Sequence, residues 1–274
     1  MWKAILLCAF IYKPFVGLAL DYTIVPLPPT NEIRKASICI AETSEHPSAI
    51  LVLCPGFNGD GSKLIKKDKW IQFARENNLR MVGVTFESPL EMVTTGCGYF
   101  YANRESGQML LDALDRLDNR KLPILIYGFS AGAHFTSSFE EWIPERILGW
   151  CAYSAGWWET PKRKNTNPPG IIACGENDPE RYGASLEYFC KGRSLGKPWA
   201  WISLENRGHE FSPVLEDFIR AYFTDLISTS LSHGMIYDID TKELSKNIST
   251  DILSVTCWMP SQKTAAFWKI IHKP

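Results

Sequence analysis

The chain has 274 residues, of which 45% are hydrophobic, and a formal net charge of −1. This length and composition suffice to bury one large core, so one main globular domain is expected. A net charge this close to zero gives no broad positive field, which excludes nucleic acid as an expected partner.

The first twenty residues resemble a secretory signal. Lys3 supplies a positive charge, an apolar stretch follows at 4–12, and small residues precede position 20. The stretch is too short to span a bilayer, so no stable membrane insertion is expected. Lys13 and Pro14 interrupt it, which leaves open a start codon placed too early, or a peripheral hydrophobic arm on a cytoplasmic protein. We predict a signal peptide at 1–20 and a secreted or periplasmic protein.

After residue 20 the chain alternates apolar runs with amphipathic segments. Short apolar runs predict strands near 22–26, 35–42, 48–54, 80–86, 122–127, 147–153, 169–174 and 198–204. Helical periodicity predicts helices near 62–77, 104–118, 131–142, 180–193 and 211–229. This alternation predicts an α/β fold, with a mostly parallel central sheet and helices on both of its faces. We assign residues 21–232 to this domain.

A glycine-rich loop, residues 55–61, follows the apolar run 48–54 and precedes a predicted helix. Such a loop can aim backbone N–H groups at a bound group. Phosphate is one candidate, but the loop lacks the Gly-x-x-x-x-Gly-Lys-Ser/Thr spacing, and the charge of Asp60 would repel phosphate. The sequence therefore disfavours nucleotide binding at this loop.

Ser130 lies in the pentapeptide Gly128-Phe129-Ser130-Ala131-Gly132, between a predicted strand and a predicted helix. A strand that turns sharply into a helix at a serine is the nucleophile-elbow arrangement, which lifts the hydroxyl clear of the backbone. Gly128 and Gly132 make the turn feasible, because Cβ atoms there would crowd the strand and the helix. The same pentapeptide also occurs as an ordinary glycine-rich turn, and its flanking elements favour a nucleophile.

A serine nucleophile of this kind needs a carboxylate and a histidine after later strands, in that chain order. Asp178 follows the apolar run 169–174, and His209 follows the run 198–204. Because the carboxyl ends of parallel strands meet at one edge of a sheet, we expect both side chains to lie near Ser130. Glu176 stays open as an alternative acid, and Asp178 as a simple turn residue.

The other histidines fit the role of base less well. His134 lies inside the predicted helix and is expected to point away from the exposed side of Ser130, and the rest lie in polar or terminal segments: His46, His233 and His272. His209 is therefore the predicted general base.

The connection 154–168 is too short for a helical lid, which predicts an open pocket. Trp157 and Trp158 lie in it, where they could line a substrate-binding wall or equally pack against the core. The aromatic loop 88–102 is a second candidate wall.

Residues 233–274 stand apart as an appendage packed on the core, with strand-like segments at 235–240 and 251–258 and a helix at 260–271. Asn247-Ile248-Ser249 is a glycosylation sequon, a triplet that is common by chance. Four cysteines lie in apolar runs, where free buried thiols are expected: Cys39, Cys54, Cys151 and Cys174. Besides Cys8 in the predicted signal, the other three lie in contexts suited to a bridge: Cys97, Cys190 and Cys257.

Four segments together resemble the α/β-hydrolase family, and within it the single-domain esterases of the polyhydroxyalkanoate-depolymerase and feruloyl-esterase type. The segments are 55–61, 127–132, 175–178 and 208–211, and the resemblance extends over residues 34–229. It implies a triad of Ser130, Asp178 and His209, with an oxyanion hole formed by the N–H groups of Ala131 and Phe57. Many relatives begin the oxyanion loop with His-Gly, where this chain has Pro55-Gly56, so Asn58 stays open as an alternative to Phe57.

The sequence thus predicts a serine hydrolase that cleaves carboxylic esters through a covalent acyl-enzyme. The expected substrate is a small-molecule or polymer-borne ester, and the chemistry requires neither a metal nor an organic cofactor. A serine peptidase of the prolyl-oligopeptidase kind uses the same triad, but it generally carries a large extra domain for which this chain has no room. A catalytically silent binding protein on the same scaffold is the other alternative. No pattern predicts the oligomeric state.

Overall fold

The structure is a computed structural model that describes residues 20–93, 95–228, 234–245 and 255–272. Almost all of the predicted signal, and the whole sequon at 247–249, lie outside these ranges, as do Cys8 and His233. Within them, no helix combines the length and the apolar character that crossing a membrane requires.

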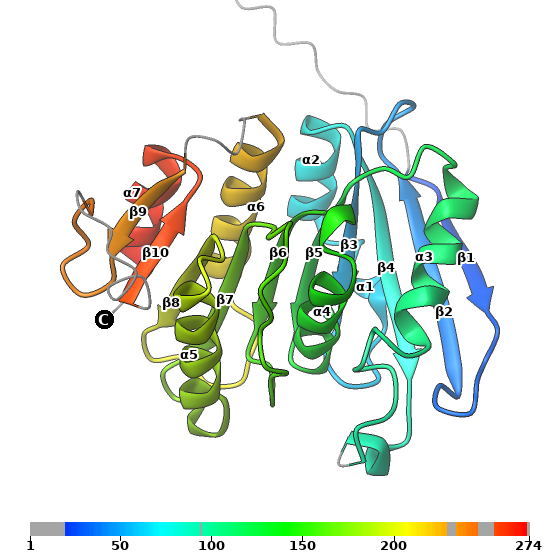
Figure 1. Cartoon of the computed structure of the whole chain (residues 1–274). Coiled ribbons are helices and arrows are strands. Elements are labelled where there is room, and N and C mark those ends of the chain that lie inside the picture. The colour runs from blue at the N-terminus through cyan, green and yellow to red at the C-terminus, as the bar shows by residue number, and fades with distance from the viewer. Residues whose placement is uncertain (1–19, 94, 229–233, 246–254, 273–274) are drawn as a thin grey trace, which may run out of the picture.

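An eight-stranded sheet forms the centre of the molecule, with strand order β1-β2-β4-β3-β5-β6-β7-β8 (Figure 1). The strands are β1 Tyr22–Leu27, β2 Lys35–Glu42, β3 Ala49–Cys54, β4 Leu79–Glu87, β5 Ile124–Phe129, β6 Ile147–Tyr153, β7 Gly170–Gly175 and β8 Trp199–Leu204. β1 and β2 run antiparallel to their neighbours, and the pairs from β4 to β8 are parallel. The predicted mostly parallel sheet is confirmed.

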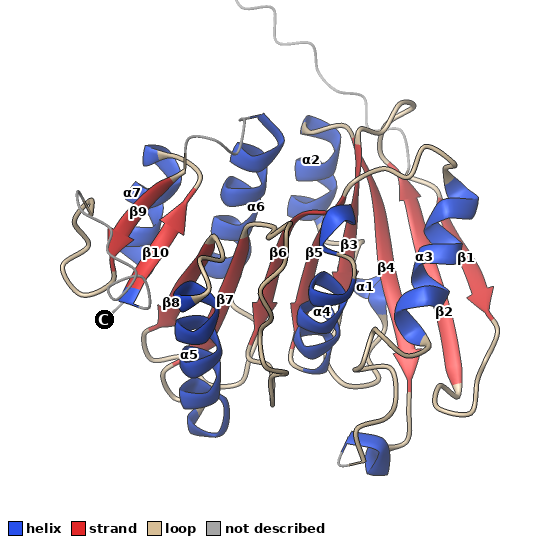
Figure 2. Ribbon diagram, viewed as in Figure 1, coloured by secondary structure: helices blue, strands red, loops and turns tan. Residues whose placement is uncertain are grey.

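Helices cover both faces of the sheet, so its inner strands are buried on both sides (Figure 2). Every residue of β3, β5, β7 and β8 is buried, as the continuous apolar runs predict. One face carries α3 Ser106–Leu117, α4 Ala131–Trp142 and α5 Pro179–Ser194, and the other carries α1 Gly61–Leu64, α2 Asp68–Glu76 and α6 Pro213–Ser228. Two short 3₁₀ turns, η1 Leu90–Val93 and η2 Pro144–Arg146, complete this part of the chain.

The single helix predicted at 62–77 is wrong, because the chain forms α1 and α2 with a break between them. Lys67 has extended backbone angles, φ −71° and ψ 123°, and α2 begins after it. Leu64 and Ile65 are buried before the break, and an unbroken helix would next turn charged residues 68 and 69 inward. The break resets the helical phase, so that Trp70 and Phe73 face the sheet instead.

The carboxyl-terminal segment supplies β9 Met235–Asp238 and β10 Thr256–Met259, which pair as an antiparallel hairpin, and α7 Gln262–Ile271. Side chains from this segment form hydrogen bonds with backbone groups at the open edge of β8. The Trp201 N–H lies 3.1 Å from Cys257 Sγ, Trp268 Nε1–H donates to the Trp201 carbonyl at 2.9 Å, and the Ser203 N–H donates to His272 Nδ1 at 3.1 Å. The segment therefore covers an edge that would otherwise offer unpaired backbone groups to another chain.

This packing corrects one sequence-based interpretation. Cys257 is fully buried in β10 and is not available for a bridge; His272, in the terminal segment, is buried as well. All seven cysteines in the described ranges are free, and those at 39, 54, 151 and 174 are buried as expected.

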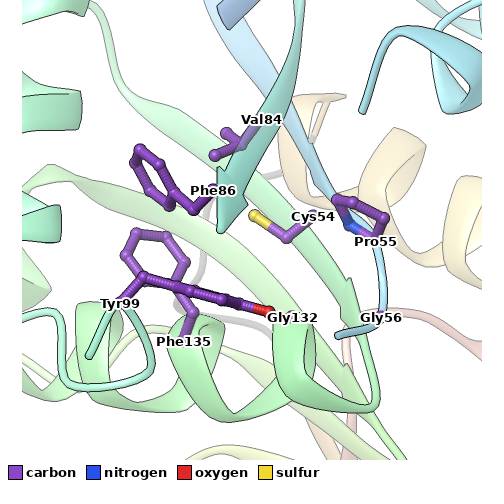
Figure 3. A pocket seen from close by; sticks show the side chains of 8 residues that line it. All are labelled: Cys54, Pro55, Gly56, Val84, Phe86, Tyr99, Gly132 and Phe135. Carbon is purple, nitrogen blue, oxygen red and sulfur yellow. The ribbon is translucent and has the colours of Figure 1, made fainter. Parts of the chain in front are cut away.

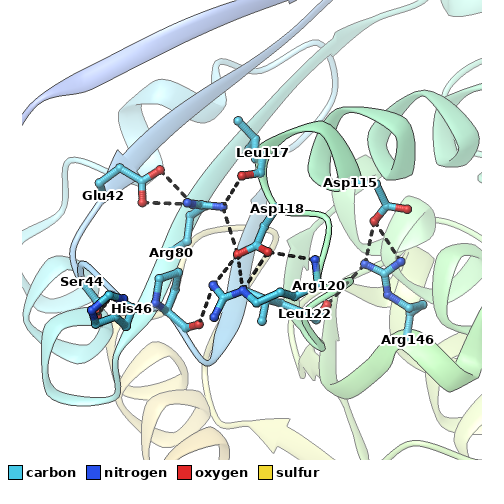
Figure 4. Close-up of polar contacts among 11 residues, drawn as sticks. Glu42, Ser44, His46, Arg80, Asp115, Leu117, Asp118, Arg120, Leu122 and Arg146 are labelled. Carbon is cyan, nitrogen blue, oxygen red and sulfur yellow. Dashed lines mark hydrogen bonds and ion pairs between the residues drawn. The ribbon is translucent and has the colours of Figure 1, made fainter.

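Ion pairs lie at the end of the sheet where the parallel strands begin (Figure 4). Arg80, at the start of β4, donates to Glu42 at 3.0 Å and to the Leu117 carbonyl at 3.2 Å. Arg146 donates to Asp115 with two nitrogen atoms, each at 3.1 Å. These contacts tie α3 to the sheet at the edge opposite the carboxyl ends of the strands.

The contact of His272 predicts a pH dependence of stability. Its Nδ1 accepts a hydrogen bond and burial lowers its pKa from 6.5 to about 4, so the folded state holds it neutral. The unfolded chain protonates this group below pH 6.5, so its stabilisation is complete above 6.5 and is lost as the pH falls to about 4. The loss amounts to roughly 3 kcal/mol.

Urea unfolding at pH 7 and pH 4.5 measures this effect. His272→Asn should flatten the dependence, because the amide oxygen can accept from Ser203 without titrating, while the exposed His46→Asn should leave it unchanged. His134, whose pKa burial lowers to about 3, contributes to the remaining slope, as do carboxyl groups with a lowered pKa such as Asp118. An unaltered pH dependence in His272→Asn contradicts the assignment.

Candidate active site

Ser130 lies between β5 and α4 with a backbone conformation that residues other than glycine rarely adopt. Its φ is 56° and its ψ is −119°. Such a conformation costs on the order of 1–3 kcal/mol and persists only where the surroundings enforce it. The Ser130 N–H donates to the Tyr153 carbonyl at 2.8 Å, and the Ser130 carbonyl accepts from the N–H of Ala133 at 2.9 Å. Strand β6 and the first turn of α4 thus hold the serine in place.

Two glycines allow this turn to form. A Cβ atom at Gly128 would lie 2.1 Å from the Gly132 carbonyl oxygen, and one at Gly132 would lie 2.3 Å from the carbonyl oxygen of Pro55. Both distances are far below van der Waals contact, so no larger residue fits either position without moving backbone. The requirement for glycine at both positions, expected from the pentapeptide, is confirmed.

The three predicted catalytic side chains converge at the carboxyl ends of β5, β7 and β8. His209 Nε2 lies 2.9 Å from Ser130 Oγ, and His209 Nδ1 lies 2.8 Å from Asp178 Oδ2. Because the carboxylate can only accept, Nδ1 carries the proton and Nε2 is free to accept from the hydroxyl. The arrangement can therefore move a proton from Ser130 to His209.

Asp178 is the acid that contacts the histidine, and Glu176 is not. Asp178 is buried, and its second oxygen accepts from Arg181 Nη1 at 2.8 Å. Glu176 accepts instead from Asn206 N–H at 3.2 Å and Ser203 Oγ at 3.4 Å. The sequence analysis missed Arg181. Its position three residues after Asp178, at the start of a predicted helix, is the signal that could have indicated the contact.

The glycine-rich loop lies beside the serine. A Cβ atom at Gly56 would be 3.5 Å from Ser130 Cβ, so the loop passes within contact of the elbow. The Asn58 N–H donates to Tyr99 Oη at 3.1 Å, while in the described part of the chain no protein acceptor takes the N–H of Phe57 or of Ala131. Those two donors are therefore free for a bound oxyanion, and Asn58 is already engaged.

Asn58 also locks the loop through its side chain. Its Nδ2 donates to the Ser88 carbonyl and its Oδ1 accepts from the Ser88 N–H, both at 3.1 Å, and its φ of 50° is one that asparagine tolerates better than most residues. Gly61 N–H donates to Thr85 Oγ1 at 3.0 Å. These bonds fix the direction in which the loop presents its N–H groups.

A small apolar pocket lies under the glycine-rich loop, between β3, β4 and α4 (Figure 3). Its lining includes Cys54, a potential rival nucleophile. Burial raises the pKa of the Cys54 thiol to about 12, so it stays protonated at neutral pH and is unreactive.

Aromatic rings flank the histidine. The Phe129 ring stacks on His209 with centroids 5.0 Å apart, and Phe211 packs on Phe129 at 4.4 Å. Phe57 is 41% exposed and Phe211 is 40% exposed. Exposed aromatic surface near Ser130 can hold the apolar part of a substrate.

Trp157 and Trp158 lie on the face of the sheet that carries α4 and α5. Trp157 packs on His134 at 4.1 Å, and Trp158 stacks on Tyr188 at 4.3 Å. In the described ranges no ring contact or hydrogen bond joins either indole to the three converging side chains. Their role in substrate binding stays a prediction. His134 is buried, and its Nδ1 donates to the Phe100 carbonyl at 2.9 Å, away from Ser130.

Comparisons with known proteins place the fold. No protein-family model matches the chain, and no curated protein matches its sequence. Among solved structures it is similar to the fluorophosphonate-binding serine hydrolase F of Staphylococcus aureus, with 15% identity and a TM-score of 0.54 over 76% of this chain and 98% of that one. An esterase of Pyrococcus furiosus gives 12% identity and a TM-score of 0.57 over 76% and 92% of the two chains.

A poly(3-hydroxybutyrate) depolymerase of Bordetella parapertussis is similar as well, with 15% identity and a TM-score of 0.52 over 75% of this chain and 90% of that one. Together with the strand order, these likenesses show that the chain has the α/β-hydrolase fold. The resemblance expected from the sequence is confirmed at the level of the fold.

The close approach of Gly132 to Pro55 predicts opposite effects of alanine at two helical glycines. Gly132→Ala should destabilise the protein by about 1–3 kcal/mol or more, since the new methyl group meets backbone. Gly183→Ala, inside α5, meets nothing within 4 Å and should stabilise by about 0.5–1 kcal/mol. Urea unfolding of both variants measures the difference, and equal effects would rule out the steric account.

Proposed function

We propose that this protein is a carboxylic ester hydrolase that uses Ser130 as nucleophile, His209 as general base and Asp178 as the acid that orients the histidine. The observation that carries the proposal is the unbroken chain of two hydrogen bonds, 2.9 Å from Ser130 to His209 and 2.8 Å from His209 to Asp178. A hydroxyl is a weak nucleophile, and a base within hydrogen-bond distance activates it.

The first half of the reaction forms an acyl-enzyme. Ser130 Oγ attacks the ester carbonyl carbon while His209 Nε2 takes the hydroxyl proton, and Asp178 stabilises the imidazolium that results. The tetrahedral intermediate then collapses as His209 passes this proton to the leaving alcohol. In the second half, water attacks the acyl-enzyme as His209 takes its proton. His209 then returns this proton to Ser130 Oγ as the bond to the acyl group breaks and the acid is released.

The backbone supplies the charge stabilisation. As the carbonyl oxygen becomes negative, the N–H groups of Ala131 and Phe57 donate to it, because neither is engaged by the protein. Ala131 is the first residue of α4, so the helix dipole adds to the attraction for negative charge at that point.

Ester substrates fit the form of the site. The connection between β6 and β7 contains no helix, and the His209 side chain is 32% exposed, so the site is open to soluble or polymer-borne esters. The names of the similar structures, an esterase and a poly(3-hydroxybutyrate) depolymerase among them, support an ester as substrate. On the basis of the predicted signal at 1–20, we also propose that the enzyme is exported. Amino-terminal sequencing of the mature protein tests this.

Replacing the nucleophile tests the function directly. Ser130→Ala should lower kcat for a p-nitrophenyl acyl ester by about 10⁵–10⁶-fold, since the attacking atom is removed. Ser194→Ala, an exposed serine on α5, is the matched control and should keep wild-type turnover. Turnover by Ser130→Ala at the wild-type rate would exclude the proposal.

Tyr99 is predicted to position the oxyanion loop. Tyr99→Phe removes the acceptor of the Asn58 N–H and lets the neighbouring Phe57 N–H drift, which should lower kcat by about 10- to 100-fold with little change in KM. Tyr22→Phe, on the distant edge strand β1, should leave both constants unchanged. The idea fails if folded Tyr99→Phe retains the wild-type kcat.

A further inference from the structure

Two neighbouring hollows lie along the connection between β6 and β7, which crosses the face of the sheet between α4 and α5 (Figure 1). The first has a volume of about 200 Å³ and is lined by Trp158 and by the outer side of α5. The second has a volume of about 120 Å³ and is lined by Trp142 and by polar residues of α4 and the connection. Glu159 and Thr160 line both, so the hollows are adjacent; the first has Trp157 as well as Trp158 in its lining.

Trp158, in the lining of the first hollow, is held as a fixed platform. Its ring stacks on Tyr188 with an interplanar angle of 18°, and Tyr188 in turn stacks on the buried Trp199. Trp158 Nε1–H donates to Ser185 Oγ at 3.1 Å, which prevents rotation of the indole. A ring fixed before binding loses little conformational entropy when a ligand stacks on it.

Polar groups of both charges surround the two hollows. Three acidic and three basic residues line the two hollows: Glu141, Glu159, Glu187, Lys162, Lys164 and Lys191. Glu187 and Lys191 pair at 2.6 Å, and Glu141 pairs with the buried Lys197 at 2.7 Å. Acidic and basic side chains that neutralise one another disfavour a ligand with a strong charge of either sign. They leave many donors and acceptors for a neutral, hydroxyl-rich ligand.

From these observations we propose that the first hollow binds one sugar ring of a neutral polysaccharide on Trp158, and that the polysaccharide continues across the smaller second hollow. A cavity of about 150 Å³ accommodates a six-membered ring, so a hollow of about 200 Å³ has room for one. The apolar face of a pyranose stacks on an indole while its hydroxyls reach the polar rim. Binding of the polysaccharide does not depend on the proposed function; only the idea that the polysaccharide carries the ester to be cleaved rests on it.

Calorimetry with cellohexaose, xylohexaose and mannohexaose tests the inference. At least one hexaose should bind, and Trp158→Ala should weaken that binding by about tenfold or more, because the platform is lost. Ile24→Ala, an exposed apolar residue on the distant strand β1, should leave the affinity unchanged. Absence of binding by all three sugars to the wild type overturns the inference, as does equal affinity in folded Trp158→Ala.

A second readout avoids dependence on the folding of that variant. In ¹⁵N-labelled wild type, the bound hexaose should shift the indole N–H signal of Trp158, assigned through Trp158→Phe. A shift confined to other tryptophans overturns the inference. Because binding is measured without turnover, wild-type protein that hydrolyses esters but binds no sugar refutes this inference alone, while sugar binding without ester turnover refutes the proposed function alone.

Discussion

The backbone conformation of Ser130 is the constraint on which the rest of the site depends. A serine with φ of 56° exists only because β5 and α4 approach each other at Gly128 and Gly132 more closely than side chains would permit. The same approach brings the loop of Gly56 against the serine. The Ser130 hydroxyl, the His209 imidazole and the loop thus meet at one point because Gly128 and Gly132 carry no Cβ atoms.

The two ends of the parallel strands differ in their polar contacts. At the amino ends of the parallel strands, Arg80 pairs with Glu42 of β2 and donates to the Leu117 carbonyl, which ties α3 to β4. At the carboxyl ends, the polar groups of Ser130, Asp178 and His209 contact one another and face an open surface. The carboxyl-terminal segment covers the lateral edge of the sheet at β8, where Cys257 and His272 accept hydrogen bonds from backbone N–H groups. The site therefore rests on a sheet whose open edge beside β8 is covered.

Much of the fold was predictable from the sequence, since buried parallel strands read as continuous apolar runs and their ends mark where polar side chains gather. That logic placed Ser130, Asp178 and His209 at one edge, where the structure brings them together. It failed where partners are distant in sequence. The break before Trp70 follows from packing against the sheet, which local sequence does not show. Likewise, the residues around Cys257 and His272 give no sign that these side chains accept hydrogen bonds from the backbone of β8.

The central claim is that the fold at Ser130 makes one hydroxyl reactive. A fluorophosphonate probe reacts only with an activated serine, and intact-mass and peptide analysis after incubation locate the adduct. We predict a single adduct on Ser130 in the folded protein and none after unfolding in urea, because activation requires His209 at 2.9 Å. The absence of an adduct on the folded protein, or its location on another residue, would contradict this account.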